Sequence, residues 1–383
     1  MLHMTRNSLN DRAAWEKANV KLPKFDVQAV VDATAKAPIW VHFGAGNIFR
    51  GFVAALQQHL LNEGLADRGI IAADTFDYDI IDKIYTPFDN LTMNVTLNAD
   101  ATTTREIIAS VTEGLRADST DEGMMQRLRE IFTADSLQMV SFTITEKGYA
   151  LYRADGTLLP VVEEDMANGP AKARHAMSMV AALLLARYEA GAAPVAVVSM
   201  DNCSHNGEKL SGSVRTVAEA WVKNGFAPQG FADYLSDPAK VSFPWSMIDK
   251  ITPRPAKSVE ESLAADGIAD MAPIVTGKNT FIAPFVNAER PQYLVIEDSF
   301  PNGRPALEKA GVYLTDRETV NNTERMKVTT CLNPLHTAMS VYGCMLGYTL
   351  ICEEMKDADL VNLVRTLGYQ EGLPVVVDPK ILS

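Results

Sequence analysis

Residues 39–74 read IWVHFGAGNIFRGFVAALQQHLLNEGLADRGIIAAD, and this stretch decides the fold. Residues 39–45 form a short apolar run that predicts a buried parallel strand. Residues 49–63 carry apolar side chains at the three- and four-residue spacing of a helix, and residues 69–73 predict a second strand that ends at Asp74. Strand, glycine-rich turn, helix, strand and acidic residue follow one another in the order of a dinucleotide-binding βαβ unit.

The alternation of strands and helices continues along the chain. Residues 138–145, 194–200 and 292–298 predict further strands, and residues 171–190 predict a helix between the first two of them. Alternation of this kind indicates an α/β fold with a Rossmann-type doubly wound sheet.

The length of 383 residues suits two domains. The sequence becomes mostly helical from residue 318 onward, because apolar residues there recur at helical spacing. We therefore expect a Rossmann-type NAD-binding domain over residues 1–317 and a helical substrate domain over residues 318–383.

The composition is that of an acidic globular protein. Lysine and arginine number 35 against 48 aspartate and glutamate, and the net charge of −13 argues against nucleic acid or an anionic membrane as partner. No apolar run approaches the roughly 20 residues that span a bilayer. The opening residues MLHMTRNSLNDR lack the apolar core of a secretory signal, so we expect a cytoplasmic protein that acts on a small molecule. The oligomeric state stays open.

Cysteine and histidine spacing predicts no metal site. The four cysteines contain no CxxC pair, and the six histidines are scattered without an HExxH motif. We therefore expect neither a structural nor a catalytic zinc ion.

The glycine-rich turn departs from the usual fingerprint. Gly44, Gly46 and Gly51 give G-x-G-x4-G, and Phe49 stands where the third glycine is usual, which predicts wider packing of helix on strand. In a nucleotide site, Gly44 allows the tight turn and Gly46 allows pyrophosphate to approach the backbone. The alternative is an ordinary strand–helix turn.

Residues around this turn complete the predicted cofactor site. Asn47 and Ile48 follow the second glycine, and Arg50 can add a phosphate contact. Asp74, at the end of the second strand, can accept hydrogen bonds from the ribose hydroxyls and repel a 2′-phosphate, which favours NAD over NADP. The alternative for Asp74 is a surface acid in an acidic loop.

Polar residues follow two further strands at the edge where such sheets bind ligands. Thr143 and Thr145 are predicted to contact the nicotinamide end, and Glu146 to pass protons towards solvent. Asn202 would point a carboxamide into the same crevice, where an amide can stabilise a developing alkoxide. A plain strand exit and a simple Asp-Asn turn are the alternatives.

Residues 327–337, KVTTCLNPLHT, bring an amine, a carboxamide and an imidazole to the start of an apolar helix. Asn333 and His336 are three residues apart and share a helix face. Lys327 lies six residues before Asn333, roughly 240° around an ideal helix, so either Pro334 produces a kink or bulge or Lys327 precedes the first turn. The alternative reading is a surface lysine, a capping asparagine and a core histidine.

Six stretches together resemble the long-chain mannitol dehydrogenase family of polyol dehydrogenases. They occur in the family's order: VHFGAGNIFRG (41–51), FTITEKGY (142–149), SMDNCSHNG (199–207), SMIDKITP (246–253), IEDSFPNGRP (296–305) and KVTTCLNPLH (327–336). The resemblance implies a zinc-independent enzyme with a Rossmann-type N-terminal domain and a mostly helical C-terminal domain.

The resemblance also implies roles for particular residues. Lys327 is the general base, Asn202 and Asn333 polarise the carbonyl, His336 orients the substrate, and Asp249 falls near cofactor and substrate. In the family the lysine is commonly five residues before the asparagine, whereas here the gap is six. Family members usually have a longer C-terminal part, so a fragment and a shortened member are both open.

We expect an NAD-dependent oxidoreductase that interconverts a ketose or keto-sugar acid and its polyol or aldonate. D-fructuronate/D-mannonate is the preferred pair, and D-fructose/D-mannitol is the alternative. An alternative of another class is a nucleotide-binding sensor without hydride chemistry.

Overall fold

The structure is a computed structural model that describes residues 1–98 and 102–381. It divides into two compact units, each described here by itself. The first contains Met1–Leu294 and Ser299–Tyr313, and the second contains Val295–Asp298 and the chain from Leu314 onward.

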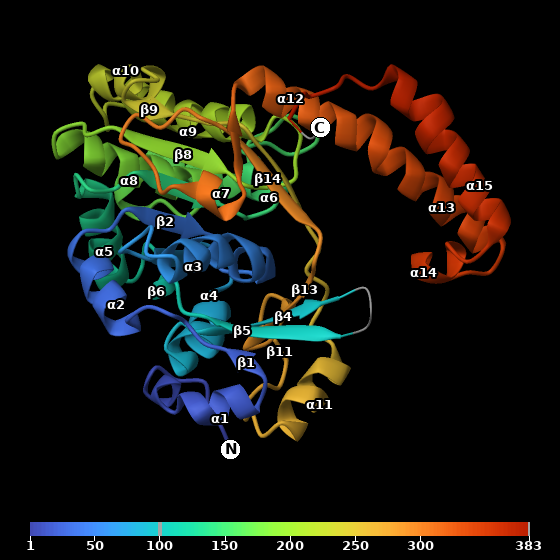
Figure 1. Ribbon diagram of the computed structural model, residues 1–383. Coiled ribbons are helices and arrows are strands. Elements are labelled where there is room, and N and C mark those ends of the chain that lie inside the picture. Colours follow the sequence, from blue (N-terminus) through green and yellow to red (C-terminus); the bar gives the residue numbers. More distant parts are fainter. Residues whose placement is uncertain (99–101, 382–383) are drawn as a thin grey trace. The chain divides into compact units, whose positions relative to one another are not determined.

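A six-stranded parallel sheet forms the centre of the first unit (Figure 1). Its order across the sheet is β6 (Val111–Arg116), β3 (Ile70–Asp74), β2 (Trp40–Phe43), β7 (Met139–Phe142), β8 (Val195–Ser199) and β9 (Val241–Ser242). Numbered along the chain, this is the order 3-2-1-4-5-6 of a doubly wound sheet. The Rossmann-type prediction is confirmed.

The reversal of strand order falls between β2 and β7. These two strands pair in parallel from Trp40 opposite Met139 to Phe43 opposite Phe142. The connections that follow two such strands lead in opposite directions, which opens a crevice at the carboxyl ends of the strands. The predicted glycine turn directly follows β2, so the fold places it at this point.

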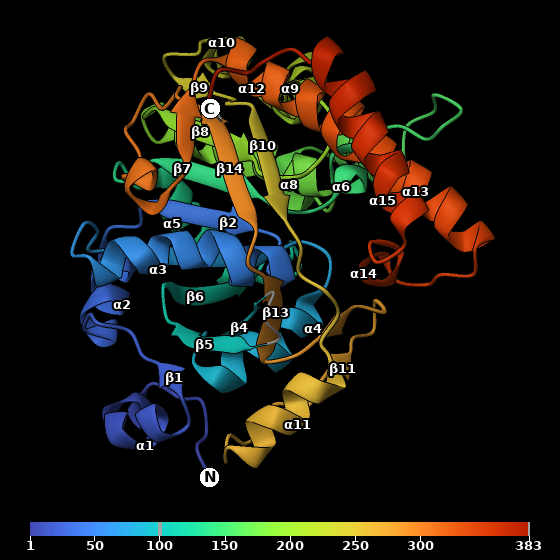
Figure 2. The same ribbon diagram turned by 45° about the vertical axis from the view of Figure 1, so that its right-hand side comes forward.

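Side chains of β2 alternate between the two faces of the sheet. Val41 and Phe43 belong to the main apolar core, which also contains side chains of the helices that cover that face. Those helices are α5 (Glu122–Thr133), α8 (Ala176–Glu189) and α9 (Asn206–Lys223). Trp40 and His42 point to the opposite face, where α2 (Val27–Lys36) and α3 (Ala54–Asn62) lie (Figures 1 and 2).

A second, four-stranded sheet was not predicted from the sequence. Its order is β1 (Val20–Lys21), β5 (Thr103–Ile108), β4 (Thr92–Leu97) and β13 (Phe285–Glu289), with β4 and β5 antiparallel and the outer pairs parallel. It encloses its own apolar cluster, to which the N-terminal segment contributes Trp15. The predicted strand at 292–298 exists as β14 (Gln292–Glu297), but it lies outside the doubly wound sheet.

The remaining helices and strands of the first unit are short. They are α1 (Arg12–Lys17), α4 (Tyr78–Ile80), α6 (Glu146–Tyr149), α7 (Pro160–Asn168), α10 (Gln229–Ser236), α11 (Lys257–Ala265), β10 (Ser246–Lys250), β11 (Ile274–Val275) and β12 (Phe281–Ile282).

The second unit is mostly helical, as expected. After β15 (Tyr313–Thr315) it contains α12 (Arg317–Met326), α13 (Asn333–Met345), α14 (Ile351–Glu354) and α15 (Ala358–Arg365). The carboxylate of Asp316 accepts from the Thr319 N–H at 2.8 Å and caps α12. Asp357 caps α15 in the same way, through the N–H groups of Asp359 and Leu360.

A buried arginine stabilises the face of the sheet covered by α8. The guanidinium of Arg187 donates to five backbone carbonyl oxygens, those of Phe132, Ala134, Leu137, Ala193 and Pro194, at 2.5–3.2 Å. All five N–H groups of the guanidinium are thereby used. The carbonyl groups that they satisfy lie at the end of α5 and just before β7 and β8, where no neighbouring strand donates to them.

Arg187→Lys should destabilise the fold. A lysine has three donors on a single nitrogen and cannot reach all five carbonyls, and each buried polar group left unsatisfied costs about 1–3 kcal/mol. We expect a loss of at least about 3 kcal/mol in urea unfolding followed by circular dichroism. Arg215→Lys is the control, because Arg215 donates to one carbonyl, that of Leu235. Equal losses in both variants would contradict this role for Arg187.

Candidate active site

The glycine turn after β2 is built around a position that only glycine fits. Gly44 has φ +99°, and a Cβ there would lie 2.1 Å from the Thr143 carbonyl oxygen of the neighbouring strand exit. Its N–H donates to the Ala73 carbonyl at 2.8 Å, which ties the turn to β3. A Cβ on Gly46, in contrast, would meet no atom within 4 Å. The turn is therefore closed on the Gly44 side and open at Gly46.

Asp74 holds the turn through backbone hydrogen bonds. Its carboxylate accepts from the N–H of Ala45 at 3.1 Å and from the N–H groups of Phe76 and Asp77 at 2.8 Å each. Burial raises the pKa of Asp74, and the three N–H groups oppose that rise. The sequence predicts a ribose contact for Asp74; the structure adds a positioning role that the sequence did not reveal.

Arg50 does not face an open phosphate site. Its side chain is fully buried, and its guanidinium donates to the Ala283 carbonyl and to Asn47 Oδ1, at 2.8 Å each. Burial lowers the pKa of Arg50 to about 10. Arg50 therefore orients the amide of Asn47 and does not point into an open site, as the predicted direct phosphate contact would require. Ile48, which follows Asn47, is exposed.

The Phe49 ring lies between the helix and His42 of β2, at the position where the third glycine is usual. The helix begins with a π turn, Phe49–Val53, and the Phe49 ring stacks on His42 of β2 with ring centroids 4.1 Å apart and planes 10° from parallel. The glycine further along, Gly51, lets this turn approach β13, since a Cβ there would lie 2.8 Å from Val286. A π turn and a ring stack therefore replace the third glycine of the usual fingerprint.

A chain of hydrogen bonds lies under the turn. Trp40 Nε1 donates to Ser141 Oγ at 2.7 Å, Ser141 Oγ is 2.6 Å from His42 Nδ1, and His42 Nε2 is 2.8 Å from Thr143 Oγ1. Thr143 Oγ1 donates to the Gly44 carbonyl at 3.2 Å. Every group is satisfied only if Ser141 donates to Nδ1 and His42 carries its proton on Nε2. The chain therefore fixes the Thr143 hydroxyl and the Gly44 carbonyl together.

His42 is neutral in this arrangement. Burial lowers its pKa to about 3, because an imidazolium in a dry core loses its hydration. It therefore orients its neighbours and carries no charge at neutral pH.

The exits of β7 and β8 are joined by one carboxylate. Asp201 accepts from the N–H groups of Ile144 and Thr145, at 2.8 and 3.0 Å. Thr145 is exposed and directly precedes α6, and Glu146 forms an ion pair with Lys209. The predicted relay residue Glu146 is thus an exposed member of an ion pair.

The side chain of Asn206 holds the loop that carries Asn202. The buried amide of Asn206 donates to the carbonyls of Asp201 and Ser246, both at 3.0 Å, and its Oδ1 accepts from the Ser246 N–H at 3.1 Å. Asn202 itself is exposed at the carboxyl edge of the sheet. Asp249 lies on β10, half-buried, three residues after Ser246.

Lys327, Asn333 and His336 belong to the second unit. Lys327 is 6% exposed and opens a π turn, Lys327–Cys331, in which its carbonyl accepts from the Leu332 N–H at 2.8 Å. Asn333 and His336 are exposed in the first turns of α13, and Pro334 occupies its start, where its missing N–H costs nothing. The irregularity predicted for this stretch is present, and it precedes the proline.

The π turn gives a physical account of the six-residue gap between Lys327 and Asn333. A π turn closes through a hydrogen bond that spans five residues instead of four. It therefore holds one residue more than an α-turn, which is enough to accommodate the one extra residue relative to the spacing that the family resemblance implies.

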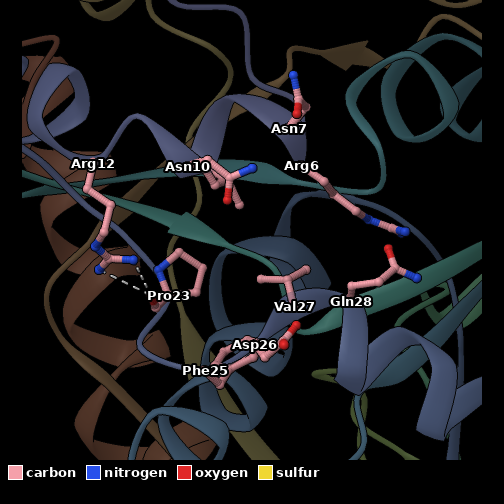
Figure 3. A pocket seen from close by; sticks show the side chains of 10 residues that line it. Arg6, Asn7, Asn10, Arg12, Pro23, Phe25, Asp26, Val27 and Gln28 are labelled. Carbon is pink, nitrogen blue, oxygen red and sulfur yellow. Dashed lines mark hydrogen bonds between the residues drawn. The ribbon is translucent and has the colours of Figure 1, made fainter.

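A cavity of about 540 Å³ lies beside the exits of β7 and β8, lined by Glu146, Tyr149, His205 and Lys209 among others. A separate cavity of about 410 Å³ is lined only by residues 6–28 of the N-terminal segment (Figure 3). In it the guanidinium of Arg12 is turned towards Pro23, to whose carbonyl it donates at 3.4 Å. Because no predicted site residue lines this second cavity, it is not the predicted nucleotide site.

The described residues contain neither a metal-binding cluster nor a membrane-spanning helix. Across residues 1–98 and 102–381, no three or more histidine, cysteine or acidic side chains converge in an arrangement that would hold a metal ion. In the same part of the chain, no helix combines the length and the apolar character that crossing a membrane requires.

The strand order and the buttressed glycine turn define a Rossmann-type dinucleotide-binding protein. The family model of the mannitol dehydrogenase Rossmann domain matches residues 38–309. The chain belongs to the mannitol dehydrogenase family.

Three relatives illustrate the relationship. The D-mannonate oxidoreductase of Thermotoga maritima is 54% identical over 384 residues, which cover 100% of this chain and 70% of that protein. The mannitol 2-dehydrogenase of Pyrenophora tritici-repentis is 30% identical over 376 residues, covering 96% of this chain and 61% of that protein. The Pseudomonas fluorescens mannitol 2-dehydrogenase, solved as a ternary complex with NAD and D-mannitol, superposes with a TM-score of 0.76 at 26% identity. That superposition covers 98% of this chain and 70% of the other.

The lowered pKa of His42 predicts a dependence of stability on pH. Between pH 6.5 and its folded pKa of about 3, the unfolded chain binds a proton at His42 and the folded chain does not. Acidification in that window therefore favours unfolding, by up to about 1.4 kcal/mol per pH unit.

His42→Gln should make this slope shallower by up to about 1.4 kcal/mol per unit between pH 6.5 and 5, whatever the offset in absolute stability. The measurement is the free energy of unfolding in urea at several pH values. The exposed His59→Gln serves as control and should leave the slope as it is. An unchanged slope in His42→Gln would show that His42 is not held neutral.

Proposed function

We propose that the chain is an NAD-dependent oxidoreductase that interconverts D-mannonate and D-fructuronate. The main support is the glycine turn, which lies where the strand order of a Rossmann sheet reverses. In addition, the chain is 54% identical over its whole length to a D-mannonate oxidoreductase. Oxidation removes a hydride from the alcohol carbon and a proton from its hydroxyl, which leaves a ketone. NAD, when bound, accepts the hydride.

The first unit supplies the nucleotide site in this proposal. The open space beside Gly46 fits the approach of a pyrophosphate to the backbone, and the N–H groups of Asn47 and Ile48 follow at the start of a helix. Arg50 holds the Asn47 amide, and Thr143 and Thr145 face the nicotinamide end. The carboxylate of Asp74 disfavours a 2′-phosphate, which supports NAD over NADP.

The second unit supplies the proton transfer. Lys327 accepts the hydroxyl proton in oxidation and returns it to the carbonyl oxygen in reduction, and its burial supports a role as general base. By the family resemblance Asn333 polarises the carbonyl and His336 orients the substrate, and the same resemblance assigns carbonyl polarisation to Asn202 of the first unit. Amide donors and a lysine together perform the polarisation that a zinc ion performs elsewhere, so the proposed reaction needs no metal.

The proposal places the enzyme in the cytoplasm. All four cysteines are thiols, which suits a reducing compartment.

D-mannitol oxidation is the second candidate, because two of the similar proteins are mannitol 2-dehydrogenases. The two candidates differ in a carboxylate, and a charged hydrogen bond to it is worth about 1.5–3 kcal/mol, or roughly 10–100-fold in kcat/KM. NADH oxidation followed at 340 nm with D-fructuronate and D-fructose separates them. Higher kcat/KM on D-fructose would favour the second candidate, and NADH binding without turnover on any ketose would favour a nucleotide sensor.

Gly46→Ala tests the pyrophosphate contact. The new Cβ meets no atom within 4 Å in the protein, so the variant should fold with unchanged thermal stability. It would nevertheless fill the space beside the backbone that the nucleotide approaches, so NADH affinity should fall at least about tenfold, or 1.4 kcal/mol. Titration calorimetry measures the affinity. Gly212→Ala, in the middle of α9 where a Cβ is also free of contacts, is the control. Unaltered NADH binding in Gly46→Ala would move the nucleotide elsewhere.

Lys327→Ala tests the general base. Loss of a general base lowers kcat by about 10²-fold or more, whereas NADH affinity should be retained because the nucleotide residues lie in the first unit. Lys356→Ala, an exposed lysine of the second unit, is the matched control and should turn over normally. A decrease of less than about threefold in kcat for Lys327→Ala would assign the proton transfer to another group.

A further inference from the structure

Thr145 adopts a backbone conformation that is costly for its side chain. It lies at φ +68° and ψ +160°, directly after the exit of β7. A β-branched residue at positive φ is a rare outlier, and such strain persists only where surrounding groups enforce it. Because Thr145 is exposed, packing of its own side chain cannot supply that enforcement.

Asp201 supplies the enforcing contacts. Its Oδ2 accepts from the Ile144 N–H at 2.8 Å and from the Tyr149 hydroxyl at 2.6 Å, and its Oδ1 accepts from the Thr145 N–H at 3.0 Å. Two successive N–H groups thus point at one carboxylate, which fixes the peptide on both sides of Ile144. The contact joins residues more than fifty positions apart in the chain.

Asp201 is itself held rigidly. The Asn206 amide donates to the Asp201 carbonyl at 3.0 Å, and the Tyr149 hydroxyl also lies 2.8 Å from Ser199 Oγ at the end of β8. Burial raises the pKa of Asp201, and the hydrogen bonds from Tyr149, Ile144 and Thr145 oppose that rise. A half-buried carboxyl group that holds an exposed, strained residue is more than a loop closure requires, since an unstrained loop would close at lower cost.

We propose that Asp201 is a positioning residue for the reaction: it holds Thr145 in its left-handed conformation and thereby fixes Thr145 relative to Asn202. The proposal rests on the proposed function, in which Thr145 faces the nicotinamide end and Asn202 donates to the substrate oxygen. Asn202 is the next residue after Asp201, so one side chain sets both strand exits.

Asp201→Asn tests the proposal, with Asp165→Asn as the matched control. An asparagine presents an NH2 group to one of the two backbone N–H groups, so it cannot accept from both. Asp165 is also buried and accepts from two successive N–H groups, those of Arg174 and His175, at 2.9–3.1 Å. Asp165 lies on α7, away from the residues of the proposed site, and its Oδ2 accepts from both N–H groups. Asp165→Asn therefore tests the loss of a buried carboxylate without the loss of an acceptor for either N–H group.

The first readout is hydrogen–deuterium exchange of the peptide covering residues 143–149, measured on protein without cofactor. Asp201→Asn should accelerate exchange there, and Asp165→Asn should not. The second readout is turnover of D-fructuronate with NADH. Asp201→Asn should lower kcat/KM about 10–100-fold, the effect of a misplacement of about 1 Å, and Asp165→Asn should stay within about threefold of the parent protein.

Thr145→Gly in the Asp201→Asn background separates positioning from stability. Glycine adopts positive φ without strain, but Thr145→Gly also removes the side chain that faces the nicotinamide end, so the double variant is compared with the Thr145→Gly single variant. Asp201→Asn should lower kcat less in the Thr145→Gly background than in the parent protein. An equal loss of kcat in both backgrounds, unchanged exchange at 143–149 in Asp201→Asn, or an equal loss of kcat/KM in Asp165→Asn would each overturn the proposal. A parent protein that neither binds NADH nor reduces a ketose would overturn the oxidoreductase function instead, and the exchange comparison would still decide whether Asp201 holds the loop.

Discussion

The loops at the carboxyl ends of the parallel strands have few ladder hydrogen bonds, and buried polar side chains hold their backbone groups instead. Asp74 accepts three N–H groups around the exits of β2 and β3, and Asp201 accepts two at the exit of β7. The hydroxyl of Thr143 connects His42 to the glycine turn after β2. The proposed nucleotide site depends on these contacts, because its own residues are short loops that would otherwise have no fixed conformation.

Holding the loops in this way requires groups that are unfavourable to bury. Burial raises the pKa of both Asp74 and Asp201 and lowers that of His42. Each of these shifts disfavours the charged form, and for the two carboxyl groups the observed hydrogen bonds oppose the effect of burial. His42 is neutral, so its ring has one donor nitrogen and one acceptor nitrogen. The hydrogen bonds that lead from Trp40 through His42 towards Gly44 therefore all have the same donor-to-acceptor direction.

Local pattern was enough to predict the elements that carry the turn. The strands at 40–43, 139–142 and 195–199 and the helix at 176–189 fall within the predicted ranges, because buried parallel strands read as apolar runs between glycine or acidic residues. The antiparallel strands β4 and β5 were missed because the predicted strands were the continuous apolar runs of buried parallel strands, whereas TMNVTL (92–97) alternates polar and apolar residues, which is the pattern of an antiparallel strand. The roles of Asp201 and Arg50 could not be predicted, since their partners, such as Ile144 and Ala283, are far away in sequence. The chemistry assigned to Lys327 rests on resemblance and burial, and the spacing predicted an irregularity at Pro334 but did not place it in the π turn that begins at Lys327.

The central claim is that the buttressed turn after β2 binds the pyrophosphate of NAD. The most direct measurement is a crystal structure of the protein with NADH. We expect phosphate oxygens within hydrogen-bonding distance of the backbone N–H groups that follow Gly46, with the nicotinamide towards Thr143 and Thr145. A dinucleotide bound elsewhere, with the turn unoccupied, would contradict it.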